Sequence, residues 1–197
     1  MIEEPRTAAI VGAVLAAGAL AVWVMAAGLD GYAFFAFLFR LAHILSAMVW
    51  VGLIVFINFI QLEATRKGDD ATRSVLHAAV APNVAWWVRH ASTLTVASGA
   101  VLLVAGGYAL PSLVYGTAVY VPPSRAVMLW LAVGAAFAMW MFVHMYIWPN
   151  MQVVIGLRPG DAAAKQAARG RVVRYSRYNL MLALPVTLVM VAAAHLY

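Results

Sequence analysis

The segment FLFRLAHILSAMVWVGLIVFINFIQLEA, which covers Phe37–Ala64, decides the fold class of this chain. An α-helix needs about 20 apolar residues to cross a hydrocarbon core of about 30 Å, and this segment exceeds that length. Its charged residues are Arg40 near the start and Glu63 near the end, and His43 is the one histidine between them. This length and composition are typical of a membrane-spanning helix.

The composition of the whole chain agrees with that interpretation. Hydrophobic residues make up 65% and charged residues 10% of the sequence, whereas soluble proteins average about 25% charged residues. We therefore predict an all-α integral membrane bundle of five transmembrane helices, which forms a single domain over 1–197. The flank MIEEPR is acidic, so the first span is expected to be retained rather than removed as a signal peptide. The predicted spans cover about 8–27, 32–62, 83–108, 126–155 and 174–196.

The basic residues predict the orientation in the membrane. The net charge is +6, and most positive residues lie in two connections between spans. By the positive-inside rule these connections face the cytoplasm, which puts the N-terminus inside and the C-terminus outside a bacterial inner membrane. We therefore expect membrane lipid, and no nucleic acid, as the partner of these charges. The residues are Arg66, Lys67 and Arg73 in one connection and Arg158, Lys165, Arg169 and Arg171 in the other.

Histidines inside the spans are the main functional signal, because ionisable side chains in hydrocarbon usually mark function. His43 precedes Glu63 by 20 residues, and His195 follows Arg177 by 18 residues. At about 1.5 Å per residue, both lie about 27–30 Å from the inner interface. They are therefore predicted to form an outer pair. Four of the five histidines lie in predicted spans: His43, His90, His144 and His195.

The other two histidines are predicted to form an inner pair. His90 follows Arg89 and lies near the Trp86–Trp87 pair, which is typical of an aromatic belt at the inner interface. His144 lies near Pro149, close to the inner end of its span. Each pair therefore combines two helices at a similar depth.

Two imidazoles from facing helices can ligate one b-type haem. The chain has no cysteine, which excludes covalent c-type attachment. We therefore expect haem b, one or two per chain, held by His43 with His195 and by His90 with His144. Arg40, one turn before His43, could pair with a propionate. Two irons would lie about 15–20 Å apart. This predicts an electron-transfer protein, or a component of an oxidoreductase, that delivers electrons to a cytochrome c or a larger respiratory complex.

The same residues allow other interpretations. Each histidine could simply hydrogen-bond to a neighbouring helix, and Arg40 could extend to the outer headgroups. Met145 and Met151 near His144 keep copper as an alternative metal. The small-residue first span suits helix packing, so the chain could instead be a non-redox accessory subunit of a larger membrane complex. A homo-oligomer is also compatible with the sequence.

Several segments resemble the N-terminal membrane domain of the bacterial membrane-bound, cytochrome c-linked urate oxidases. They are Phe37–Ala64, WWVRHASTLTVASGAVLLV, MYIWPNMQVVI and RYSRYNLMLALPVTLVMVAAAHLY. The resemblance covers about 37–195 and implies a haem-linked module that passes electrons to a cytochrome c. It implies ligand roles for His43 and His195, whereas His90 and His144 do not match the family pattern. The family's full form ends in a c-type cytochrome domain. This cysteine-free chain would be a short form with a separate cytochrome c, or a urate-oxidising membrane module.

Overall fold

The computed structural model describes residues 4–28, 30–105, 109 and 121–195. Within these ranges the chain is helical and has no strand. Five described helices are long and apolar enough to cross a membrane, which confirms the predicted fold class of a multi-pass membrane protein. The predicted positions 106–108 and 196 lie outside the described residues, and the orientation stays a prediction. The five helices are Pro5–Ala27, Gly31–Lys67, Asp70–Ala105, Pro123–Val154 and Ala162–His195.

The chain divides into two compact units, 1–38 and 39–197. In the first unit, α1 (Pro5–Ala27) ends where Gly28 adopts a φ of 63°, a left-handed conformation that glycine allows. Asp30 then begins α2 (Gly31–Phe56), because its Oδ1 accepts the backbone N–H of Ala33 at 2.8 Å. The prediction of a single domain stays a prediction.

Most of the long helices contain a π-helical turn within the described ranges. Such turns are rare, are usually single, and often occur at functional sites. The first, η1, separates α2 from α3, the second, η2, separates α4 from α5, and the third, η3, separates α6 from α7. Their bounds are Ile57–Gln61 (η1), Leu62–Lys67 (α3), Asp70–Val75 (α4), Leu76–Val80 (η2), Ala81–Ala105 (α5), Pro123–Met141 (α6), Phe142–Ile147 (η3), Trp148–Val154 (α7) and Ala162–His195 (α8).

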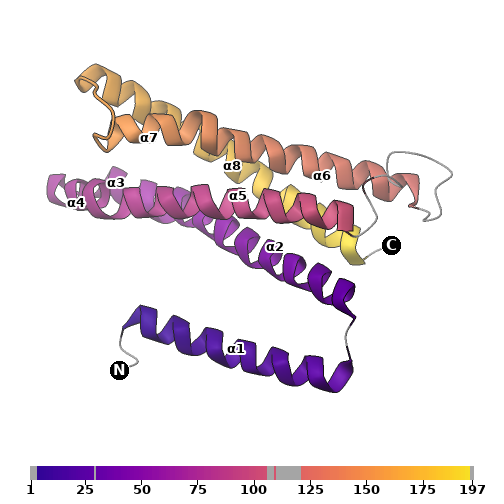
Figure 1. Cartoon of the computed structure of the whole chain (residues 1–197). Helices are drawn as coiled ribbons and strands as arrows, with labels where there is room; N and C mark the ends of the chain where they lie inside the picture. Colours follow the sequence, from indigo (N-terminus) through magenta and orange to yellow (C-terminus); the bar gives the residue numbers. More distant parts are fainter. Residues whose placement is uncertain (1–3, 29, 106–108, 110–120, 196–197) are drawn as a thin grey trace. The chain divides into compact units, whose positions relative to one another are not determined.

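In the second unit, successive long helices run in opposite directions (Figure 1). The end of the bundle formed by α3, α4, α7 and the start of α8 carries most of the basic residues, and we call it the basic end. The opposite end contains the last turns of α5 and α8 and the first turns of α6 (Figure 1). The helix α8 begins well before the predicted span at 174, so the polar segment is part of the same helix.

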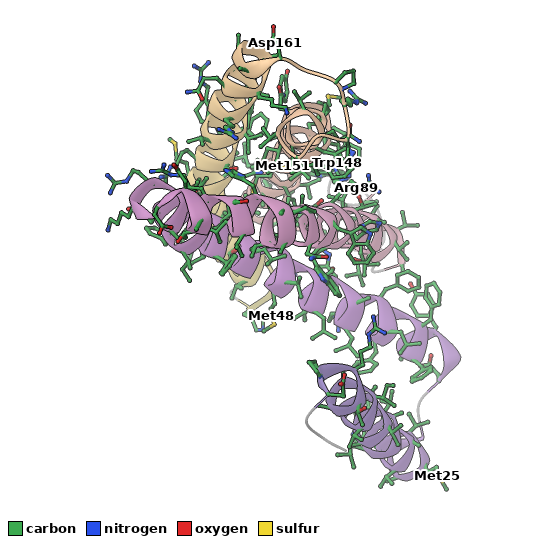
Figure 2. All side chains as sticks on the ribbon, turned by 90° about the vertical axis from the view of Figure 1, so that its left-hand side faces the viewer. Met25, Met48, Arg89, Trp148, Met151 and Asp161 are labelled. Carbon is green, nitrogen blue, oxygen red and sulfur yellow. The ribbon has the colours of Figure 1, made fainter. Side chains whose placement is uncertain are left out.

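The core of the second unit joins four long helices. It contains one cluster of buried side chains, which are Trp50 and Ile54 of α2, Val88 and Ala91 of α5, Met139 and Val143 of α6 and η3, and Ala183 of α8. Apolar residues also cover the outside, where Met181 is 70% exposed and Met48 of α2 points away from its neighbours (Figure 2). Lipid is as apolar as these side chains, so close packing rather than escape from water holds the helices together.

Removing packed volume from this core should therefore destabilise the bundle. Met139 is 2% exposed, and we expect Met139→Ala to lower the free energy of unfolding by about 2–5 kcal/mol because it leaves a cavity. Met181→Ala is the matched control on the exposed surface. Thermal unfolding in detergent would measure both, and equal melting temperatures for the two variants would contradict the assigned core.

Candidate functional site

The four predicted ligand histidines share one feature: the Nδ1 atom of each imidazole lies within hydrogen-bond distance of a backbone carbonyl oxygen. A carbonyl oxygen only accepts, so in the neutral imidazole Nδ1 carries the proton and Nε2 keeps its lone pair. This is the arrangement typical of metal-ligating histidines, whose second ring nitrogen donates to a carbonyl or carboxylate. The acceptors are Thr95 O for His43 (2.8 Å), Trp86 O for His90 (2.7 Å), Trp140 O for His144 (3.0 Å) and Val191 O for His195 (2.9 Å).

His43 differs from the other three because its acceptor lies on another helix. The carbonyl of Thr95 belongs to α5, so this hydrogen bond joins α2 to α5. The Thr95 hydroxyl also lies 2.9 Å from Ser46 Oγ, so polar side chains of α2 and α5 meet at this point. The ring lies against Gly99, where an added Cβ would be 2.9 Å from the His43 Cε1 atom. A glycine at this position therefore allows the imidazole to approach the backbone of α5.

His144 is placed by η3 and contacts α5. Its Nε2 lies 3.1 Å from the hydroxyl of Thr93. Its ring stacks on Trp140 with 4.5 Å between centroids, and the Trp140 indole donates to the same hydroxyl at 3.2 Å. His90 lies one helical turn before Thr93, is exposed, and stacks on Trp86 at 4.0 Å. The structure thus brings His144 to the part of α5 that carries His90.

Within each predicted pair, no contact that the structure describes joins the two histidines directly. His43 contacts α5, whereas His195 is exposed at the end of α8. Shared ligation of one iron by each pair stays a prediction. Arg40 is exposed and lies one turn before His43, so its pairing with a propionate also stays a prediction. The described residues contain no group of three or more His, Asp or Glu side chains that could hold a metal ion, and copper bound by His144 with Met145 and Met151 stays a prediction.

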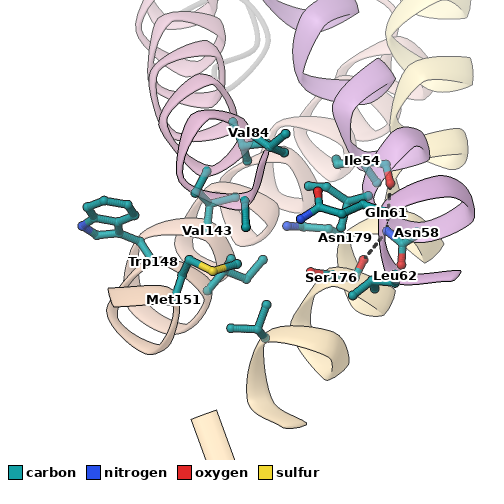
Figure 3. Close-up of a pocket in the computed structure, with 16 residues that line it drawn as sticks. Ile54, Asn58, Gln61, Leu62, Val84, Val143, Trp148, Met151, Ser176 and Asn179 are labelled. Atoms are coloured by element: carbon teal, nitrogen blue, oxygen red, sulfur yellow. Dashed lines mark hydrogen bonds between the residues drawn. The ribbon is translucent and has the colours of Figure 1, made fainter. Parts of the chain in front are cut away.

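A pocket of about 50 Å³ lies near the basic end, between η1, α5, η3, α7 and α8 (Figure 3). None of the four histidines is among its described lining residues, so a haem that they ligate lies outside it. The sequence alone did not predict this pocket. A signal was present, since Asn58 and Gln61 interrupt an apolar segment, but the third buried amide, Asn179, is distant in sequence. Its polar lining residues are Asn58, Gln61, Ser176 and Asn179.

Comparison with protein-family models, with curated proteins and with solved structures finds no match for this chain. The resemblance to the membrane-bound urate oxidases therefore depends on the quoted sequence segments alone.

The contact between His43 and Gly99 gives a direct test of the His43 geometry. We expect Gly99→Ala to displace the imidazole, since the new methyl group would lie 3.1 Å from its Nδ1 atom. Loss of the hydrogen bond to Thr95 should cost about 1 kcal/mol. The ¹⁵N chemical shift of the His43 ring would report the change. Gly134→Ala is the control, because no heavy atom lies within 4 Å of a Cβ there. An unchanged His43 signal in Gly99→Ala would contradict the described contact.

Proposed function

We propose that this chain is a membrane-embedded, b-type cytochrome-like electron-transfer protein with one or two haems ligated by histidines. One observation carries the proposal: each of the four proposed ligand histidines uses Nδ1 for a backbone carbonyl, which leaves Nε2 to ligate a metal. The proposed ligands of the outer haem are His43 and His195. The proposed ligands of an inner haem are His90 and His144.

The donor chemistry of these side chains fits a haem, which supplies one-electron redox chemistry when it is bound. The Thr95 carbonyl would fix the orientation of the His43 ring and raise the basicity of its Nε2 atom. The Nε2 atom of His144 now lies beside the Thr93 hydroxyl, so iron ligation there would replace one hydrogen bond. Arg40 would neutralise a propionate one turn from His43.

The proposed direction of electron flow follows from the predicted orientation. With the basic end in the cytoplasm of a bacterial cell, His43 and His195 would lie toward the outer surface of the inner membrane. A soluble cytochrome c, or a larger respiratory complex, would then receive electrons at that surface. A second haem at His90 and His144 would extend the electron path across the membrane.

The spectrum of the purified protein tests haem binding. We expect chain produced in haem-replete cells to show a b-type α-band in its reduced-minus-oxidised spectrum. Well-folded protein without that band would refute the proposed function.

Substitution of the outer ligands tests the pairing. We expect His43→Ala and His195→Ala each to convert the same haem from six-coordinate to five-coordinate, with a shifted spectrum and weaker haem retention. His77→Ala, at the one histidine outside the proposed ligand set, should keep the wild-type spectrum. If either ligand variant keeps its full low-spin haem, His43 and His195 do not ligate the same iron.

The number of haems per chain tests the inner pair. If the wild type binds two haems, combined substitution of His90 and His144 by alanine should reduce the haem-to-protein ratio from two to one. The spectrum of the outer haem should stay unchanged. A wild-type ratio of one would mean that His90 and His144 are interfacial residues and that electrons do not cross the membrane through this chain.

A second candidate function is that of a non-redox accessory subunit of a larger membrane complex. Within its own unit, α1 has no buried side chain among its described residues. Its small residues Ala8, Gly12 and Ala16 recur at the four-residue spacing that allows close contact between membrane helices. This candidate predicts a colourless, unstable protein when the chain is purified alone, whereas a stable red protein would refute it.

The sequence resemblance supports a third candidate, a membrane module that oxidises urate. Consumption of urate by the purified chain in the presence of added cytochrome c would support this candidate. If haem-loaded protein consumes no urate, the chain transfers electrons but does not oxidise urate.

A further inference from the structure

The pocket near the basic end is lined by polar groups on one side and by apolar groups elsewhere. Asn58 and Gln61 come from η1, and Ser176 and Asn179 come from α8. Figure 3 shows the labelled amide side chains gathered at the side of the pocket between these two helices. Apolar side chains from the neighbouring helices, among them Val84, complete the wall. The pocket is therefore amphipathic, with its hydrogen-bonding groups concentrated in one place.

Three amide oxygens at this site are buried and have no hydrogen-bond partner among the residues that the structure describes. They are Asn58 Oδ1, Gln61 Oε1 and Asn179 Oδ1. The side chains are 1%, 8% and 1% exposed, respectively. Asn58 is also fixed in place, since its Nδ2 donates to Ile54 O at 2.8 Å and to Ser176 O at 3.3 Å. A buried acceptor that stays unpaired destabilises a protein, so three together indicate a missing donor.

The volume of the pocket limits the size of the molecule that could donate these hydrogen bonds. A buried water needs roughly 10–15 Å³ of such space and two to four polar partners. The pocket of about 50 Å³ therefore has room for about three to five waters, and it is smaller than the cavity of roughly 150 Å³ that can bind an aromatic ring. Pockets that stay empty in proteins are lined by apolar groups alone, which is not the case here.

The charges around the pocket disfavour a metal cation as its occupant. No Asp or Glu is among the described residues that line it. The guanidinium of Arg177 lies beside η1, with Nη1 3.5 Å from the backbone oxygen of Asn58. A positive charge next to the pocket repels a cation, whereas it does not oppose a neutral molecule that donates hydrogen bonds.

We propose that this pocket is a binding site for a small cluster of ordered water molecules, which donate to the amide oxygens of Asn58, Gln61 and Asn179. The cluster lies between η1 and α8 and bridges the two helices. The site is distinct from the proposed haem ligands, and its existence does not depend on haem binding.

Water-edited solid-state NMR of the full chain in lipid bilayers tests this proposal. In the wild type we expect transfer of magnetisation from water to the side-chain amides of Asn58, Gln61 and Asn179. In Asn179→Leu we expect that transfer to be lost at Asn58 and Gln61, because the leucine fills the pocket and removes one partner. Asn179→Ser, which keeps a polar group and leaves space, should retain it. Asn83→Leu is the matched control, since Asn83 is exposed and does not line the pocket.

Three results would overturn the proposal. The first is a wild type without water transfer at any of the three amides. The second is a melting temperature that rises in Asn179→Leu, because removal of a dry, unpaired acceptor stabilises a protein, whereas loss of bound water destabilises it. The third is a saturable shift of the amide signals on addition of Na⁺ or K⁺, which would assign the pocket to a cation.

Discussion

Hydrocarbon contains no water, so each backbone N–H and C=O group inside the bundle must find its partner within the protein. The chain meets this constraint with long helices, whose carbonyl oxygens accept hydrogen bonds from backbone N–H groups. Some of these carbonyl oxygens accept a second hydrogen bond from a polar side chain. Ser46, Thr95 and Asn58 each donate to the carbonyl four residues earlier, and three of the four membrane histidines do the same. Among those histidines, only His43 donates to a carbonyl on another helix. This hydrogen bond both orients the His43 ring and joins two helices.

The sequence predicted the number and class of the helices but not their full length. Hydropathy marks the part of a helix that lies in hydrocarbon, so the polar extensions at Asp70–Val75 and at the start of α8 gave no membrane signal. The π-helical turns could not be predicted, because five residues such as INFIQ carry no pattern that separates them from an α-helix. They depend on contacts made after the helices pack.

For the candidate site, alternating helix directions led to the prediction of which histidines lie toward the same end, and this pairing stays a prediction. The ring orientations were not predictable, because the acceptor of His43 lies 52 residues away and its approach depends on Gly99. The pocket near the basic end could not be predicted for the same reason. Its amides come from η1 and α8, and Asn58 meets Ser176 across 118 residues of sequence. Contacts between side chains from distant segments can be predicted only once the packing of the helices is known.

The π-turn η1 has a consequence for how this chain tolerates changes in length. A π-turn accommodates one more residue than the α-helical turn it replaces, and each residue rotates an α-helix by about 100°. Deleting a single residue within Ile57–Gln61 would therefore convert the π-turn into an α-helical turn and leave α3 facing the same direction relative to α2. Glu63, Arg66 and Lys67, which form one group of ion pairs, would keep their neighbours. The same deletion in a regular α-helical turn would instead rotate every residue beyond it by about 100°.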